Sequence, residues 1–172
     1  MKELRMYFFV MGNIGTIDKG IQAGHCSQEY TNLFSKKELY KDWFKNFKTF
    51  ILLSGGTSNN GFTIDTPWDC HFDETKLGSM ELHEKFLIDN HIPHASFHEP
   101  DLNNSLSSLC FICDNKVFDW ENYPSFEKWL KLNPPTSDEP FDMEMMKSQW
   151  TELVGGEQNV KLKELIYGKK LA

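Results

Sequence analysis

Short apolar runs mark the places where this chain is expected to form buried strands. Arg5 to Met11 predicts a first strand and Phe50 to Leu53 a second, because uninterrupted apolar runs of this length are typical of central strands. Ala95 to Phe97 and Ser107 to Cys113 predict two more. Such strands alternating with helical segments indicate an α/β fold with a mixed sheet.

Apolar residues at steps of three and four predict helices between these strands. The first helix is expected to start at a cap formed by Thr16 or Asp18 and to end near Phe34. Residues 37–47 and 80–90 show the same spacing and predict two further helices.

The first helix has two contrasting faces. Four polar residues share one face at steps of four, three and four: Asp18, Gln22, His25 and Glu29. Another face, expected to pack in the core, carries Cys26, Tyr30, Leu33 and Phe34. The helix is therefore predicted to present a polar ridge beside the end of the first strand, where ligands collect in α/β sheets.

The segment after the second strand is expected to be irregular. Gly55 and Gly56 either reverse the chain or let the backbone approach a ligand. Residues 57–78 lack a clear period and predict a long flap-like connection. Its aromatic side chains would either anchor it in the core or stack on a nucleobase: Phe62, Trp68 and Phe72.

The last third of the chain is expected to be helical. Three segments predict helices: Ser125 to Leu132, Asp142 to Leu153, and Asn159 to Tyr167. Pro134 and Pro135 interrupt the chain after the first of them, so we divide it into an α/β domain of residues 1–133 and a helical extension of residues 134–172. The apolar stripe of the last helix would pack on the sheet or on a second subunit, which would make a homodimer.

Composition and charge narrow the range of partners. The 172 residues are 40% hydrophobic and 14% aromatic, enough for a substantial core. The net charge of −7 argues against broad binding of DNA or RNA, although it permits a small nucleotide in a local pocket. No stretch reaches membrane-spanning length and no secretory signal is visible, so the expected location is the cytoplasm, or the host cytoplasm if the chain is viral.

The cysteines and histidines lack the spacing of a metal site. Cys110 and Cys113 have CxxC spacing, but in a strand their side chains point to opposite faces, which favours packing. The histidines outside the first helix show no zinc-like spacing: His71, His83, His91, His94 and His98. We therefore expect reduced thiols, no metal and no cofactor.

Two short motifs are expected at the ends of strands: Gly20-Ile21-Gln22-Ala23-Gly24-His25-Cys26-Ser27 and Glu99-Pro100-Asp101-Leu102-Asn103-Asn104. Together they resemble the second class of peptidyl-tRNA hydrolases, and more closely the divergent relatives of that fold in bacteria and bacteriophages. The resemblance covers roughly residues 4–115. It implies a four-stranded mixed sheet flanked by helices, with the site over the glycine-containing first loop.

The resemblance also implies a set of site residues. In that family a Lys follows the glycine of the first motif, a Gln lies four residues further on, and an Asp comes from the loop before the last strand. In register, Ile21 stands at the Lys position, His25 at the Gln position and Asp101 at the Asp position. Lys19 stands two residues earlier and would reach the same space if the loop is reshaped.

These residue types suggest hydrolytic chemistry. Histidine is the side-chain type whose ordinary pKa lies near neutrality, and a carboxylate such as Asp101 or Glu29 would orient the His25 ring, so His25 and Asp101 are the candidate catalytic pair. The pair would activate water toward an ester or a phosphodiester. The residues expected to bind substrate are Lys19, Gln22, Glu29, Gly55, Gly56, Asn103, Asn104 and Ser107. Each of these residues also has a purely structural interpretation as a turn former or a solvated side chain.

The sequence therefore leads to one functional hypothesis and two alternatives. The first is a metal-independent hydrolase acting on a nucleotide-bearing substrate, with a small or cyclic nucleotide favoured over tRNA. The second is a phage protein that binds and sequesters a nucleotide signal without turnover. The third is a scaffold retained only for protein interaction.

Overall fold

The computed structural model describes residues 2–66, 69–134 and 142–172, without the side chains of residues 62–71. The chain forms two compact units. The α/β unit comprises Leu4–Ile112 and Gly168–Ala172, and the helical unit comprises Met1–Glu3 and Cys113–Tyr167. The boundary predicted between residues 133 and 134 lies within the helical unit.

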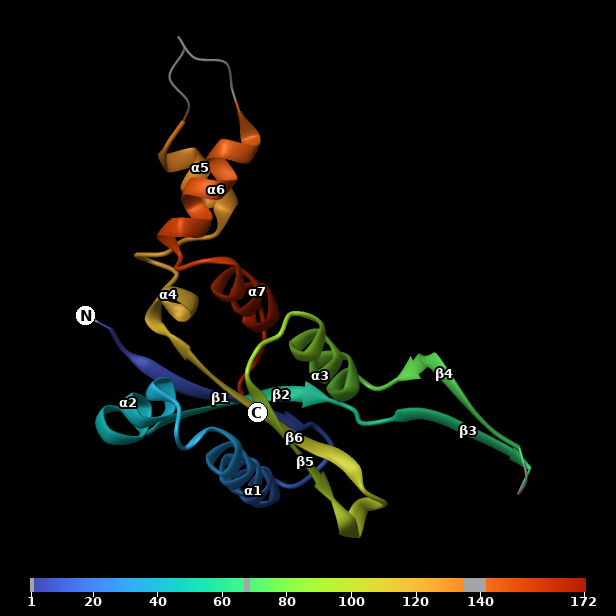
Figure 1. The fold of residues 1–172 in the computed structure, drawn as a ribbon. Helices are drawn as coiled ribbons and strands as arrows, with labels where there is room; N and C mark the ends of the chain where they lie inside the picture. Colours follow the sequence, from blue (N-terminus) through green and yellow to red (C-terminus); the bar gives the residue numbers. More distant parts are fainter. Residues whose placement is uncertain (1, 67–68, 135–141) are drawn as a thin grey trace. The chain divides into compact units, whose positions relative to one another are not determined.

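A four-stranded sheet forms the centre of the α/β unit (Figure 1). Its order is β2 (Thr49–Gly56), β1 (Leu4–Met11), β6 (Ser105–Asp114) and β5 (His94–Glu99). β1 and β2 are parallel, whereas β5 and β6 are antiparallel, so the sheet is mixed. This arrangement confirms the predicted α/β class and the four-stranded mixed sheet.

The two faces of β1 are both buried, which explains its uninterrupted apolar sequence. Met6, Phe8 and Val10 belong to a core cluster that also contains residues of α1 (Thr16–Phe34) and α2 (Glu38–Asn46). Phe9, on the alternate face, stacks on His83 of α3 (Ser79–Asp89) with ring centroids 4.3 Å apart. The sheet therefore separates α1 and α2 from α3.

The ends of the strands form one edge of the sheet. The N–H of Gly12, after β1, donates to the carbonyl of Gly56 at the end of β2 over 2.6 Å. Phe111 of β6 stacks beside Tyr7, and the N–H of Glu3 donates to Asn115 just after β6. β6 therefore runs opposite to β1 and begins at the edge where β1, β2 and β5 end.

The predicted irregular flap at 57–78 is wrong. Its residues form an antiparallel hairpin of β3 (Asn60–Thr66) and β4 (Asp69–Leu77), which makes a separate two-stranded sheet. Apolar and polar residues alternate in this segment, as expected for a strand, but Asn59, Asn60 and Gly61 are residue types that favour a loop. The stacking proposed for Phe62 and Trp68 lies outside the described side chains, whereas Phe72 is exposed.

The helical unit contains α4 (Asn115–Phe118), α5 (Phe126–Leu132), α6 (Met143–Leu153) and α7 (Glu157–Ile166). The last three confirm the predicted helices, within a few residues at each end. The apolar stripe of α7 is buried within the single chain through Leu162, Leu165 and Ile166, so burying it does not require a second subunit. No helix within the described ranges has the length and apolar character needed to cross a membrane.

Candidate functional site

The two sequence motifs meet at the sheet edge, although 77 residues separate the side chains that join them. The amide nitrogen of Gln22 on α1 donates to Oε2 of Glu99 over 2.6 Å. The hydroxyl of Ser107 on β6 donates to the amide oxygen of Gln22 over 2.7 Å. Gln22 is only 7% exposed and Ser107 is fully buried. One glutamine therefore ties α1, the end of β5 and the start of β6 into a rigid edge.

Glu99 is a site residue that the sequence reasoning missed. Its Oε1 accepts the backbone N–H of Asp101 over 3.4 Å, while its Oε2 accepts from Gln22. One carboxylate thus connects α1 to the 3₁₀ turn η1 (Pro100–Leu102). The acidic residue directly before a proline was the available signal, because such a residue often caps the turn that follows.

His25 and Asp101 lie on opposite sides of the Gln22–Glu99 bond. The exposed imidazole of His25 stacks on Phe97 of β5, with ring centroids 4.7 Å apart and an interplanar angle of 23°. Asp101 is exposed in the turn beyond β5. Within the described part of the chain, no hydrogen bond or ion pair joins the side chains of His25 and Asp101.

Three contacts set the register of α1 against β5. The Cys26 thiol donates to the carbonyl of Ala95, the next contact is His25 on Phe97, and the last is Gln22 on Glu99. The helix therefore runs antiparallel to the strand, and its first turns lie toward the end of β5 that leads into the turn carrying Asp101. Lys19 lies in these first turns, three residues before Gln22 and on the same side of the helix. Along α1, Lys19 therefore stands nearer than His25 to the end of β5, although no hydrogen bond or ion pair joins Lys19 to Asp101 among the described residues.

The polar and apolar faces predicted for α1 are partly exchanged. Gln22 was assigned to the polar ridge, yet it is buried because its amide is hydrogen-bonded on both sides. Leu33 was assigned to the core, and this prediction is wrong, since Leu33 is 60% exposed. Glu29 is exposed, as a ridge residue should be, one turn further from the edge than His25.

Gly55 and Gly56 have structural roles at the end of β2. A Cβ on Gly55 would overlap the sulfur of Met80, so the close packing of β2 against α3 requires glycine there. Gly56 adopts a φ of +84°, which other residues rarely tolerate. Neither role needs a ligand, although both positions lie at the candidate edge.

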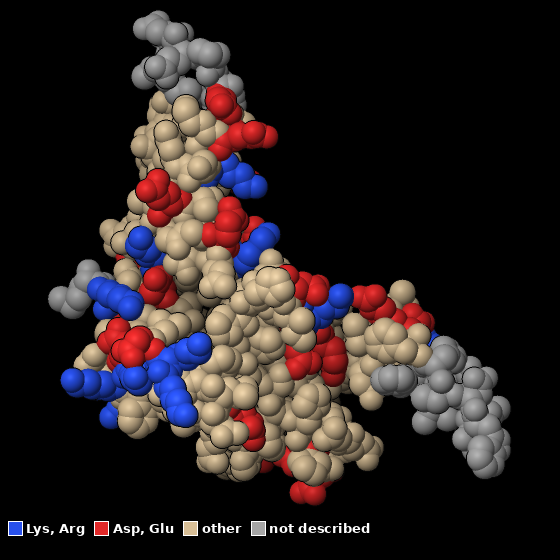
Figure 2. Space-filling model, in the orientation of Figure 1, with Lys and Arg blue, Asp and Glu red and all other residues tan. Residues whose placement is uncertain are grey.

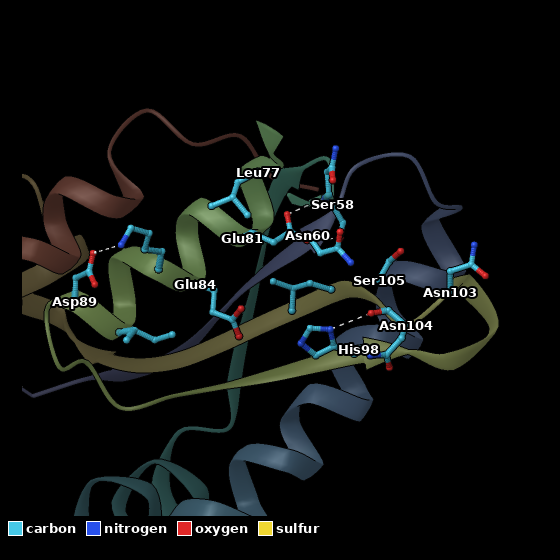
Figure 3. Close-up of a pocket in the computed structure, with 14 residues that line it drawn as sticks. Ser58, Asn60, Leu77, Glu81, Glu84, Asp89, His98, Asn103, Asn104 and Ser105 are labelled. Atoms are coloured by element: carbon cyan, nitrogen blue, oxygen red, sulfur yellow. Dashed lines mark hydrogen bonds and ion pairs between the residues drawn. The ribbon is translucent and has the colours of Figure 1, made fainter. Parts of the chain in front are cut away.

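A cavity of about 760 Å³ lies on the α3 side of the same edge (Figure 3). Asn103 and Asn104, which were predicted to bind substrate, line it, whereas Lys19, Gln22, His25 and Glu29 belong to α1 and do not. Both asparagines have positive φ, at 53° and 57°, so they also form the tight turn into β6. The predicted site residues are therefore divided between the two faces of the sheet.

The imidazole of His98 lines this cavity. Its Nδ1 lies 3.1 Å from the carbonyl oxygen of Asn104. Because a carbonyl only accepts, Nδ1 carries the hydrogen and Nε2 of the neutral ring is left as an acceptor. Figure 3 shows the His98 ring and the Glu84 carboxylate reaching into the same hollow from β5 and α3.

The cavity favours ligands that donate hydrogen bonds. Glu81 already accepts the N–H of Asn59 over 2.9 Å, and Glu84 accepts the hydroxyl of Ser96. Lys85 pairs with Asp89 over 3.3 Å, so its charge is neutralised locally. A lining of this kind suits hydroxyl and amino groups better than a bare phosphate.

Metal ligands and reactive thiols do not gather in the described residues. No three side chains of His, Cys, Asp and Glu among them are placed to hold a metal ion. The thiols of Cys26, Cys110 and Cys113 are buried. Burial is the main cause that raises the pKa of the Cys110 thiol, which makes its thiolate scarce.

No protein-family model matches this chain, and no curated protein matches it. Function is therefore inferred from the residues and their geometry.

Proposed function

We propose that the α/β unit is a metal-independent hydrolase that acts on an ester or phosphodiester of a nucleotide-bearing substrate. The observation that carries this proposal is the Gln22–Glu99 hydrogen bond, which joins the two motifs of the resemblance at one sheet edge. Ligands of α/β folds bind in the crevice at such an edge. The proposed site lies between the first turns of α1 and the turn of residues 99–104.

The side chains at this edge have complementary roles in the proposal. Lys19 would hold a phosphate or polarise a carbonyl oxygen, and Asp101, in the turn after β5, would accept a proton from the attacking water. His25 lies further along the helix on the Phe97 ring, where its exposed face would stack on a base or, as an imidazolium, donate a proton to the leaving oxygen.

The surface charge is compatible with a small nucleotide substrate and with a larger one, so both are tested. The net charge of −7 disfavours long polyanions, yet Figure 2 shows a group of Lys and Arg side chains in the part of the α/β unit where Figure 1 draws α2. Lys41 and Lys45 belong to α2, and Lys48 lies 5.3 Å above the exposed ring of Phe44. A cyclic dinucleotide tests the small substrate, and peptidyl-tRNA tests whether this lysine surface extends the site.

Product formation with both substrates tests the proposal. The wild type is compared with Asp101→Asn, Lys19→Met and His25→Ala, and Lys36→Met, in the turn after α1, serves as an exposed lysine control. We expect turnover of one substrate, with losses of about 100-fold in Asp101→Asn and about tenfold or more in Lys19→Met. Lys36→Met should keep the wild-type rate.

Two results would contradict the proposed hydrolase activity. One is unchanged turnover in both Asp101→Asn and Lys19→Met, which would place the chemistry elsewhere. The other is recovery of every bound nucleotide intact, with no product from either substrate.

The second candidate function is sequestration of a nucleotide without turnover, and the cavity beside His98 favours it. A ligand held there would lie on the α3 side of the sheet, away from His25. Glu84 and the free Nε2 of His98 would accept hydrogen bonds from sugar hydroxyls or a base amino group. We expect a sequestered ligand to bind wild type and His25→Ala alike and to bind at least about tenfold more weakly to His98→Phe.

A further inference from the structure

The helical unit contains a second cavity, of about 640 Å³, which the proposed hydrolase does not use. Three helices and the chain before α5 form its walls. Trp120 and Tyr167 meet edge to face with ring centroids 5.4 Å apart, and Phe126 and Trp150 pack with centroids 5.6 Å apart. Val160, which is buried, also lines it. Four aromatic rings thus surround a space large enough for a small molecule.

Lys163 of α7 is the unusual polar group of this cavity. It is only 2% exposed, and its Nζ lies 3.9 Å from the centroid of the Trp120 ring. Two of its ammonium hydrogens go to the carbonyls of Lys116 and Val117, at 3.0 and 3.1 Å. Within the described residues, no carboxylate lies within ion-pair distance of it. Burial lowers the pKa of Lys163 to about 8, so most of it is still charged near neutral pH.

We propose that this cavity binds a planar aromatic molecule with a single negative charge, such as an aromatic carboxylate. The rings supply flat apolar surface for stacking, and Lys163 supplies a buried cation on which Asp119 and Asp114 act from beyond ion-pair distance. Exposed Lys147 at the rim adds a second positive charge for attracting the ligand.

The charge of the lining argues for one negative charge rather than two. Glu127 and Glu164 also line the cavity, and Lys161 pairs with Glu164 over 3.3 Å. A dianion such as a phosphate monoester would meet repulsion from Glu127, whereas a monoanion can face Lys163. A small inorganic anion would also bind poorly, because it has no apolar surface to contact the aromatic walls and only the lysines would hold it.

Calorimetric titration of the full chain with three small probes tests this proposal. 2-Naphthoate carries both features, 2-naphthamide keeps the planar rings without the charge, and adamantane-1-carboxylate keeps the charge without the rings. We expect 2-naphthoate to bind about tenfold more tightly than either of the others. In a second titration, 2-naphthyl phosphate should bind more weakly than 2-naphthoate.

Variants locate the binding. Tyr167→Ala removes a ring that is 70% exposed, so the variant should fold and should bind 2-naphthoate at least about threefold more weakly. Lys163→Met should abolish the preference for 2-naphthoate over 2-naphthamide. Lys131→Met, at an exposed position of α5 outside the cavity lining, is the control and should bind as the wild type does.

A readout on Lys163 keeps the proposal testable if Lys163→Met does not fold. The lysine Cε resonance is followed against pH in the wild type, with and without 2-naphthoate, and bound carboxylate should raise the midpoint of Lys163. Equal affinity for 2-naphthoate and 2-naphthamide, an unchanged affinity in Tyr167→Ala, or an unchanged Lys163 midpoint under saturating ligand would each overturn the proposal. Absence of binding by all probes would overturn it as well.

Discussion

At the scale of single residues, the candidate edge depends on a buried amide placed between a carboxylate and a hydroxyl. Gln22 donates to Glu99 and accepts from Ser107, so each of its polar atoms has a partner inside the protein. A buried polar group that loses such a partner costs more free energy than the bond itself contributes. This edge should therefore be sensitive to a change at Gln22 even before any ligand binds.

Gln22→Ala should lower the free energy of unfolding by about 1–3 kcal/mol, because it leaves the Glu99 carboxylate and the Ser107 hydroxyl without their shared partner. Gln28→Ala, at an exposed position on the same helix, should change it by less than about 0.5 kcal/mol. Urea denaturation followed by circular dichroism measures both. Equal effects of the two substitutions would contradict the role given to Gln22.

His83 should make stability depend on pH in a defined window. Burial, and then the charge of Lys169, lower the pKa of His83 from 6.5 to about 4. Between these values the unfolded chain takes up a proton that the folded chain does not, so stability falls as pH drops from about 6.5 to about 4. Above pH 6.5 this contribution is complete.

Urea midpoints measured across that pH range test the assignment. The wild type should lose more stability on acidification than His83→Leu does, because the variant lacks the group that titrates. His91→Asn, which changes an exposed histidine with positive φ, should follow the wild type. Parallel curves for the wild type and His83→Leu would show that His83 does not titrate as described.

At the scale of elements, glycine has opposite consequences in α1 and β2. A Cβ at Gly24, inside α1, would meet nothing within 4 Å, whereas a Cβ at Gly55 would overlap Met80. The helical glycine therefore costs conformational entropy without a packing reason, and the strand glycine allows α3 to approach the sheet.

Gly24→Ala should raise the free energy of unfolding by about 0.5–1 kcal/mol. Gly55→Ala should lower it by about 1–3 kcal/mol, because Met80 or the strand must move. Thermal unfolding of the two variants beside the wild type measures the opposite signs. A loss of stability in Gly24→Ala would mean that α1 packs more closely at this position than the backbone indicates.

At the scale of the whole molecule, the chain leaves the α/β unit after Ile112 and returns to it at Gly168. The returning residues extend the sheet beside its edge strand β2. The N–H of Ser54 donates to Lys170 over 2.9 Å, and the N–H of Ala172 donates to Leu52 over 3.0 Å. The last residues therefore cover part of an otherwise open strand edge.

Deletion of residues 168–172 should lower the stability of the α/β unit by about 1–2 kcal/mol and promote self-association through β2. Urea denaturation and gel filtration at two protein concentrations measure these effects. Leu171→Ala keeps the backbone bonds and changes a side chain that is 76% exposed, so it should resemble the wild type. Full stability of the shortened chain would show that the returning residues are dispensable.

Local sequence was sufficient to predict the four strands of the main sheet and most of the helices. Their apolar runs and periods are properties of neighbouring residues, as the uninterrupted run of β1 illustrates. The hairpin of β3 and β4 was missed for two reasons. Its pairing joins two segments across a turn, and the glycine and asparagine residues at its start are typical of loops.

The site was only partly predictable, because its contacts join distant parts of the chain. The motifs around Gln22 and Asp101 could be picked out as chemically rich, yet nothing local to either indicated that Glu99 would connect them. Packing against β5 set the register that places Gln22 beside Glu99 and His25 on Phe97. Long-range pairing also buried Gln22, exposed Leu33 and placed the Asn103–Asn104 turn against a cavity on the opposite face. Periodicity along the chain reports which residues share a face, whereas the partner of that face emerges only when the whole chain packs.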